Sequence, residues 1–489
     1  MEKSSPKYIA TIGLEVHAEL KTASKMFCSC KNDPNEEHPN VNICPICMGH
    51  PGTLPVLNKE AIKHVLKVGL AVKGNRANFT EWDRKNYFYP DIPKGYQISQ
   101  YKYPLISGGL LAGVELTRIH LEEDTAQSTH DTHHKSLINF NRAGVPLMEL
   151  VTEPVIHDAI TAVNFAKELQ LVLRYLGVGE ANLEKGEMRV EANISVATPE
   201  DTKAKKFGIK TEVKNLNSFK AVEKAIAYEI DRQIKLLENG ETVMQETRGW
   251  DENAGNTFSQ RAKESSHDYR YFPDPDIPKL KVSEVEEFSI KNLETELPEL
   301  PWEKRGRLQK DFQMTDKEVP VFVESPKIGH YFEEVGKGLD NDKKLMRLAI
   351  NYILTDFIGI LKKEDKNPET SMEMVSAKNF ATLVQMIGKG ELSSRGGKDL
   401  LVILYSKFGE QNIDPVKIAN EQGLIQKSDE GEIKKIVEEI IKTNLSVVDD
   451  YKKGKMAALQ FLVGQGMKAT KGSANPEVLK KIIIETIGA

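Results

Sequence analysis

The sequence predicts an α+β protein in which a largely antiparallel sheet forms a cradle with helices on one face, followed by an all-α region. Three observations support this fold class. Before about residue 290, several segments alternate apolar and polar side chains with the period of two that a half-buried strand requires. Capped amphipathic helices separate these segments. After about residue 300, one helical pattern follows another, so this part is predicted to be helical.

The strand pattern is clearest in four segments: 12–19, 118–122, 145–151 and 188–195. Apolar residues form one face of each segment. The other face carries polar residues, which are, in chain order, Glu15, His17, Glu19, Arg118, His120, Glu122, Glu149, Arg189, Glu191 and Asn193. Since an antiparallel sheet can bury a single face, we expect helices on the apolar side and the polar side chains together on the open side.

Two long helices are predicted between the strands. Asp158 and Ser218 are their N-caps, and Gly177 and Gly240 end them. Further amphipathic helices follow in the last part of the chain, for example 344–361 and 377–388. Proline-containing segments at 296–301 and 412–415 suggest boundaries, and the length allows about three domains. We therefore predict a cradle domain (1–293), a helical domain (294–411) and a C-terminal tail domain (412–489).

The composition is that of a soluble globular protein, with 28% charged and 39% hydrophobic residues. No apolar run approaches the roughly 18 residues of a membrane-spanning helix, so no membrane association is expected. The N-terminal residues resemble neither a secretory signal nor an arginine-rich transit peptide. We expect a cytoplasmic protein, whose cysteines stay reduced.

All four cysteines of the chain lie close together, as Cys28, Cys30, Cys44 and Cys47. Two closely spaced pairs separated by a short polar loop can supply four thiolates in the tetrahedral geometry of a structural zinc site. The alternative is a set of reduced thiols without a metal. A site closed by four thiolates would brace the fold and would not activate water.

Positive charge gathers near the C-terminus although the whole chain carries a net charge of -5. Residues 451–489 contain seven lysines against two glutamates. Such a local basic surface can bind phosphate groups even on an acidic protein. The alternative is a solvated lysine face.

The polar strand faces suggest a cation site. If they meet, Glu15, His17, Glu122 and Glu149 converge, and like charges about 5 Å apart repel by roughly 1 to 3 kcal/mol per pair. A carboxylate-rich set without thiolates favours Mg²⁺ over zinc, with one imidazole as an unusual ligand. The alternative is that each glutamate pairs separately with a surface lysine or arginine.

Common nucleotide-binding motifs are absent from the sequence. Lys398 follows two glycines but lacks the first glycine and the Ser or Thr of a P-loop, and 177–182 lacks the third glycine of a dinucleotide fingerprint. Any ATP site must therefore be built from a metal-binding carboxylate cluster and nearby basic groups. Lys85 and Lys94 are candidates for the latter, with ordinary surface lysines as the alternative.

Six motifs, in order along the chain, resemble the B subunit of the tRNA-dependent amidotransferases, the GatB family. They are IGLEVH at 12–17, DRKNYFYPD at 83–91, YQISQ at 96–100, HLEED at 120–124, KNLNSF at 214–219 and DYRYFP at 268–273. The likeness continues in Gly464, Lys468, Lys471, Gly472 and 474–476, and so covers nearly the whole chain.

The resemblance implies a carbon–nitrogen ligase of translation that converts Glu-tRNA(Gln), Asp-tRNA(Asn) or both to the amide form. ATP phosphorylates the side-chain carboxylate, and ammonia then displaces phosphate. Mg²⁺ suits this chemistry because it neutralises phosphate charge during transfer. By similarity His17, Glu122 and Glu149 would hold Mg²⁺, with Glu15 beside them. Strand parity favours Glu122 over Glu123.

The resemblance also implies partners and further sites. An amidase with glutaminase activity, the A subunit, would supply ammonia, and a small C subunit would complete a heterotrimer. Lys85 and Lys94 would lie near the ammonia passage. The tail domain would bind the tRNA body through basic residues, for which the candidates are Lys452, Lys453, Lys455, Lys468 and Lys471.

Two other functions are alternatives to this one. The first is a zinc-bearing scaffold that binds tRNA while a partner performs all the chemistry. The second is the archaeal relative specific for Glu-tRNA(Gln), which carries a large inserted domain. A chain of 489 residues has no room for such an insertion, so the length favours the B subunit.

Overall fold

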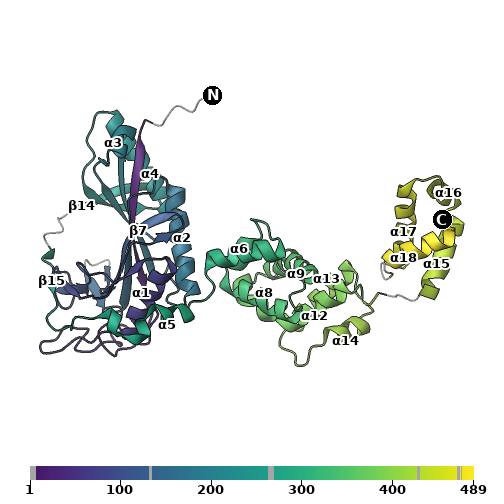
Figure 1. Ribbon diagram of the computed structural model, residues 1–489, viewed down its shortest axis with the longest axis horizontal. Coiled ribbons are helices and arrows are strands. Elements are labelled where there is room, and N and C mark those ends of the chain that lie inside the picture. The colour runs from purple at the N-terminus through teal and green to yellow at the C-terminus, as the bar shows by residue number, and fades with distance from the viewer. Residues whose placement is uncertain are drawn as a thin grey trace. The chain divides into compact units, whose positions relative to one another are not determined.

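The computed structural model describes residues 7–130, 135–262, 269–426, 430–470, 474 and 476–488. The chain forms two compact units, Met1–Pro301 and Trp302–Ala489 (Figure 1). The first contains the sheets and the helices that cover them, and the second is built from helices. The predicted α+β fold class with a helical second part is therefore confirmed. The finer limits at 293 and 411 remain predictions.

The main sheet of the first unit has ten strands in the order β14-β13-β12-β11-β1-β10-β7-β5-β2, with β6 paired to β7. Its pairs are antiparallel except for β12 with β13. The strands are β1 (Ile9–Glu19), β2 (Asn75–Arg76), β5 (Ile106–Ser107), β6 (Leu110–Leu111), β7 (Val114–Glu123), β10 (Pro146–Thr152), β11 (Met188–Ala197), β12 (Thr211–Leu216), β13 (Glu246–Asp251) and β14 (Asn256–Ala262).

Two smaller sheets complete the strands of this unit. One has the order β15-β3-β4, with β3 (Asp83–Asn86), β4 (Tyr96–Ser99) and β15 (Phe272–Pro273). The other pairs β8 (Gln127–His130) with β9 (Ser136–Asn139). The three-stranded sheet brings together segments that lie almost 190 residues apart, because Phe272 is paired with Arg84.

Helices pack on the main sheet through its apolar face. The N-caps predicted for two of them are confirmed, since the Asp158 and Ser218 side chains accept hydrogen bonds from the backbone N–H groups of Thr161 and Ala221. Figure 1 shows α1, α2 and α4 on the same side of the sheet. The helical segments of the unit are α1 (Lys59–Ala71), α2 (Ala159–Tyr175), α3 (Pro199–Lys203), α4 (Phe219–Glu238), η2 (Val282–Glu284), η3 (Glu286–Phe288) and α5 (Ile290–Thr295).

The second unit begins with a group of helices that pack on one another. One predicted helix, 344–361, differs in detail, because its middle adopts a π-helical turn. At this turn the Tyr352 hydroxyl donates a hydrogen bond to the Ser394 carbonyl oxygen at 3.1 Å. The segments are α6 (Pro301–Phe312), α7 (Val319–Val323), α8 (Pro326–Gly338), α9 (Lys343–Asn351), η4 (Tyr352–Phe357), α10 (Ile358–Lys363), α11 (Pro368–Ser371), η5 (Met372–Met374), α12 (Ala377–Gly388), α13 (Ser394–Ser406) and α14 (Pro415–Glu421).

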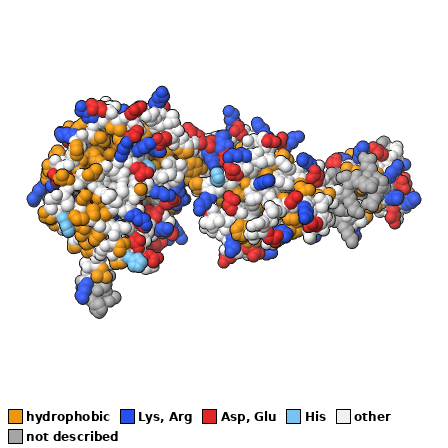
Figure 2. Space-filling view, turned by 90° about the horizontal axis from the view of Figure 1, so that it is seen from below, with side chains coloured by type: hydrophobic (Ala, Val, Ile, Leu, Met, Phe, Trp, Pro, Cys, Tyr) orange, Lys and Arg blue, Asp and Glu red, His pale blue; other side chains and the backbone are white. Residues whose placement is uncertain are grey.

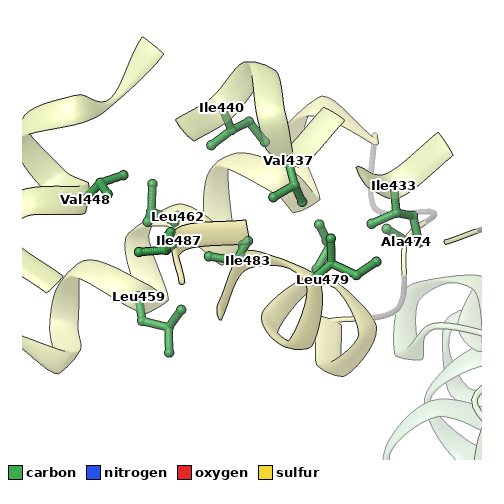
Figure 3. Close-up of a cluster of buried hydrophobic side chains, with 11 residues drawn as sticks. Ile433, Val437, Ile440, Val448, Leu459, Leu462, Ala474, Leu479, Ile483 and Ile487 are labelled. Carbon is green, nitrogen blue, oxygen red and sulfur yellow. The ribbon is translucent and has the colours of Figure 1, made fainter. Parts of the chain in front are cut away.

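Four C-terminal helices share a core of their own (Figure 3). They are α15 (Glu430–Thr443), α16 (Leu445–Lys452), α17 (Met456–Ala469) and α18 (Pro476–Ile487). Fully buried Val437, Leu462, Leu479 and Ile483 lie at its centre. By contrast, α14 packs against α12 and α13. Within the described residues, no helix combines the length and apolar character needed to cross a bilayer.

Candidate active site

One row of polar residues crosses four neighbouring strands of the main sheet. His17 on β1 is paired with Arg189 on β11 and with Glu149 on β10, and Glu149 is in turn paired with His120 on β7. Residues paired across a sheet point to the same face. The row therefore lies on one face, and the side chains two positions along β1 and β7, Glu15 and Glu122, lie on that face beside it.

The structure brings Glu15, His17, Glu122 and Glu149 into one group, called the carboxylate cluster below. The Nε2 atom of His17 lies 3.4 Å from a Glu149 oxygen, 3.6 Å from a Glu122 oxygen and 3.9 Å from a Glu15 oxygen. Three carboxylates thus surround one imidazole nitrogen. The three glutamates therefore lie together around His17, and Glu149 also pairs with Arg118.

His120 joins this cluster, although the sequence reasoning did not include it among the ligands. Its Nε2 atom lies 3.4 Å from Glu149, and its Nδ1 atom is 3.4 Å from the Arg118 Nε. The Arg118 guanidinium also donates to Glu149 at 3.3 Å. Strand parity placed His120 and Arg118 on the polar face, so the signal was present in the sequence.

The electrostatics of the cluster depend on burial and on close opposite charges. Burial raises the pKa of Glu122 to about 7 and lowers that of His120 to about 4. Burial alone would lower the pKa of His17, but the hydrogen bond to Glu149 and the neighbouring carboxylates raise it to about 9. Against the effect of burial, His120 and His17 hold the pKa of Glu149 below its usual range.

The donor atoms of the cluster fit a divalent cation. Oxygen and nitrogen atoms of Glu15, His17 and Glu149 lie within 4.8 Å of one another, and so do those of His120, Glu122 and Glu149. Glu149 belongs to both groups. Carboxylate oxygens are the ligands that Mg²⁺ prefers, and imidazole is a tolerated addition.

The two candidate lysines lie in different places. Lys85 faces the carboxylate cluster, since the charges of Glu122 and Glu149 raise its pKa against the effect of burial. Lys94 instead forms an ion pair with Glu123. The backbone N–H of Ile98 also donates to Glu123, at 2.9 Å. Glu122 accepts a hydrogen bond from Ser99 within the cluster, so adjacent glutamates point to different environments, as strand parity predicted.

The Lys94–Glu123 pair borders a small hollow that Asp124 and Cys47 also line. Arg189 donates to Asp124 at 3.0 Å, and Arg189 is the neighbour of His17 in the strand register. Charged side chains therefore lie both at this hollow, beside Cys47, and on β11 next to the strand that carries His17.

The four cysteines form a compact group, called the cysteine knuckle below. Their sulfur atoms lie within 4.8 Å of one another, whereas four sulfurs at about 2.3 Å from a zinc ion are about 3.8 Å apart. The Cys44 N–H donates to the Cys47 sulfur at 3.1 Å. The hydrogen bond from the Cys28 thiol, the Cys44 N–H and the Lys25 charge lower the pKa of Cys47 to about 5, against the effect of burial. The donor set therefore fits a zinc ion.

Lys25 connects the knuckle to the main sheet. Its buried ammonium donates to the carbonyl oxygens of Phe140 at 3.2 Å and Ala143 at 2.8 Å. The Met26 N–H donates to the Gly144 oxygen at 2.7 Å. These acceptors lie directly before β10, the strand that carries Glu149, so the knuckle supports the entrance to that strand.

The basic residues predicted to bind tRNA lie away from the tail core. Lys452, Lys453, Lys455 and Lys468 are exposed, and Lys455 forms an ion pair with Asp450 at 3.0 Å. Lys471 lies outside the described residues.

Comparison with known proteins agrees with the sequence motifs. Residues 10–287 match the family model of the GatB/GatE catalytic domain, and residues 330–487 match that of the GatB domain. The aspartyl/glutamyl-tRNA(Asn/Gln) amidotransferase B subunit of Thermodesulfovibrio yellowstonii is 42% identical over 98% of this chain and 99% of its own. The B subunits of Persephonella marina and Crocosphaera subtropica are 42% and 40% identical, and each match covers at least 97% of both chains. The resemblance is therefore confirmed, and the chain belongs to the GatB family of amidotransferase B subunits.

Proposed function

We propose that this chain is the subunit that amidates Glu-tRNA(Gln), Asp-tRNA(Asn) or both, by phosphorylating the side-chain carboxylate of the misacylated amino acid and admitting ammonia to the acyl phosphate. The observation that carries the proposal is the carboxylate cluster on the polar face of the main sheet, where Glu122 and Glu149 are buried. A carboxylate is a poor acyl donor until one oxygen can leave as phosphate, so the site must hold ATP phosphates beside it.

The cluster supplies the ligands for a metal-dependent phosphoryl transfer. We assign His17, Glu122 and Glu149 as Mg²⁺ ligands, with Glu15 and His120 beside them. Bound Mg²⁺ would neutralise the charge of the phosphates and orient them. Because its pKa lies well below neutrality, His120 is a neutral imidazole that can accept a hydrogen bond or a metal ion. Arg118 holds Glu149 from the other side.

Lys85 supplies positive charge beside the carboxylate cluster. Its raised pKa keeps the ammonium protonated at neutral pH. A fixed cation there stabilises the negative charge that gathers on the transferred phosphoryl group. We assign Lys85 to hold the phosphoryl oxygens during transfer and ammonia attack.

Ammonia must come from a partner, which we propose to be a glutaminase, the A subunit, held in a heterotrimer with a small C subunit. The charged series from Lys94 and Glu123 through Asp124 and Arg189 offers a polar route to the cluster. The Lys94–Glu123 pair, at its outer end, is suited to control entry.

The reaction can be tested by the substrate dependence of ATP hydrolysis. The complex reconstituted with its partner subunits is expected to release phosphate from ATP when Glu-tRNA(Gln) or Asp-tRNA(Asn) is present. Uncharged tRNA and Gln-tRNA(Gln) are matched controls, because neither offers a free side-chain carboxylate. Phosphate release that is indifferent to the attached amino acid, or amide formation without ATP, would contradict the proposal.

We further propose that the cysteine knuckle holds structural zinc. Purified protein is expected to contain about one zinc ion per chain, and Cys47→Ser to lose most of it together with several degrees of thermal stability. Since the chain has four cysteines in all, a thiol reagent reports on the knuckle alone. Ser29→Ala, which changes a hydroxyl between two ligands, is the control and should keep its zinc. Four freely titrating thiols in untreated wild-type protein would show that the knuckle holds no metal.

A further inference from the structure

Aromatic side chains gather at the surface next to the carboxylate cluster. They line a hollow of about 680 Å³ formed by the loops after β3 and before β15, and we call them the aromatic surface: Tyr87, Phe88, Tyr89, Tyr269 and Phe272. Phe88 is 86% exposed, and Tyr89 and Phe272 are about half exposed. Figure 2 shows one face of the first unit on which hydrophobic side chains gather. Tyr87 and Tyr269 are partly buried beneath these three more exposed rings.

The rings are held in place by a polar frame beneath them. The Asn86 amide donates to the carbonyl oxygens of Tyr269 at 3.2 Å and Arg270 at 2.9 Å. Arg84 donates to Asp274 at 2.7 Å while its guanidinium carbon lies 4.2 Å from the centre of the Tyr96 ring. These bonds join the two loops, so the aromatic surface does not depend on a ligand for its arrangement.

Glycine provides the space that Phe88 occupies. A Cβ atom added at Gly95 would come within 3.2 Å of the Phe88 ring, and Gly95 has a positive φ of 71°. The ring therefore lies against backbone on one side while most of its surface faces solvent. An exposed apolar ring fixed in this way offers a flat face to a partner.

Lys85 links the aromatic surface to the carboxylate cluster. Its ammonium lies 4.9 Å from the centre of the Tyr269 ring and 5.8 Å from that of Tyr87. Lys85 on β3 is paired with Gln97 on β4, and the Gln97 amide donates to the carbonyl oxygen of Glu123 at 2.7 Å, so the strand that carries Lys85 lies beside the end of β7 that carries Glu122. A substrate with its reacting carboxylate at the cluster therefore places the atoms behind that carboxylate on the aromatic rings.

Several features indicate a nucleic-acid strand as the occupant. Unpaired bases stack on aromatic side chains, and such stacking recurs where proteins bind single strands. The exposed Arg270 lines the same hollow, and within the described part of the chain no carboxylate forms an ion pair with its guanidinium. A cation beside stacked bases suits the phosphate that links them.

We propose that the aromatic surface stacks the unpaired 3′-terminal nucleotides of the aminoacyl-tRNA, with Phe88 as the outermost platform, and so aims the esterified amino acid at the carboxylate cluster. This inference rests on the proposed function, because it requires an amino acid carried on RNA. The first unit would then recognise tRNA at the aromatic surface, in addition to the tRNA binding proposed for the tail domain.

The test is a comparison of tRNA binding by the assembled complex. Phe88→Ala is expected to weaken binding of intact Glu-tRNA(Gln) about tenfold, as expected for losing one stacked base. The variant and the wild-type complex should bind tRNA(Gln) that lacks its last three nucleotides, and hence its glutamate, equally well. Phe88→Trp should retain the affinity, since the larger ring still stacks. The Michaelis constant for ATP and the glutaminase activity should stay at the wild-type level.

The matched control is Phe207→Ala. Phe207 is 43% exposed and follows α3, which Figure 1 shows at the opposite end of the first unit from β15. If Phe88→Ala weakens the binding of intact and shortened tRNA equally, or weakens neither, the inference is overturned. A tenfold rise in the Michaelis constant for ATP with tRNA binding unchanged would assign the rings to adenine instead, and would overturn it too. Failure of the proposed chemistry would show separately, as wild-type complex without tRNA-dependent ATP hydrolysis.

Discussion

Glu149→Gln is expected to lower the rate of tRNA-dependent ATP hydrolysis and amidation by about 10²-fold or more, with little change in tRNA binding. Glu149 is the one carboxylate shared by both candidate metal-binding groups, and it contacts both His17 and His120. Replacing it by the neutral amide removes charge where the cation must bind while keeping the shape of the side chain. Charge that is fixed in a water-poor site contributes on this scale to catalysis. Single-turnover phosphate release from labelled ATP measures the effect.

The control for this variant is Glu153→Gln. Glu153 directly follows the same strand but accepts a hydrogen bond from Thr117 at 2.7 Å, away from the cluster. It is expected to keep wild-type activity. Higher Mg²⁺ concentrations should partly restore the activity of Glu149→Gln, because the variant is expected to bind the metal more weakly. If Glu149→Gln amidates Glu-tRNA at the normal rate, the phosphoryl transfer does not take place at this cluster.

Removing residues 430–489 is expected to raise the Michaelis constant for tRNA by about a hundredfold while glutaminase activity persists. The four helices from α15 to α18 have their own core, so their loss need not disturb the rest of the second unit. The exposed lysines at 452, 453, 455 and 468 would contact tRNA phosphates, whose neutralisation provides much of nucleic-acid affinity and makes it fall with salt. Initial rates at varied tRNA concentration measure the change.

The position of the cut decides whether this experiment can be interpreted. A deletion from residue 412 would also remove α14, whose Ile418 and Ala419 are buried and which packs on α12 and α13. The matched control keeps the tail and replaces the four described lysines with glutamine. It should weaken binding and reduce its salt dependence. Unchanged use of tRNA by the truncated complex would remove the tail from the binding surface.

Much of the candidate site follows from the pattern along single strands. The alternation in β1 and β7 placed Glu15, His17 and Glu122 on one polar face, and the structure agrees. The same parity separated Glu122 from Glu123, which lies with Lys94. His120 satisfied the parity rule as well, but its closeness to Glu149 depends on the register between β7 and β10. That register is a property of two strands and cannot be read from either one.

Lys85 and Lys94 show where such reasoning stops. Both occur in turn-rich segments with similar composition, and nothing local distinguishes them. In the structure they face different carboxylates, since Lys85 extends from β3 whereas Lys94 lies in the loop before β4. The aromatic surface likewise joins loops around 88 and 270, which meet because β15 pairs with β3.

The sequence by itself determined which residues share a face and where the main helices begin and end, because these properties depend on neighbours within a few positions of the chain. It also indicated that the four cysteines belong together, because the chain has four in all and they occur in one short stretch. The tertiary structure decided which faces meet. β1 lies between β10 and β11 although more than 120 residues separate it from either along the chain. Pairing of distant strands depends on packing of the whole sheet against its helices, and only that packing brings His17, Glu149 and His120 into one row.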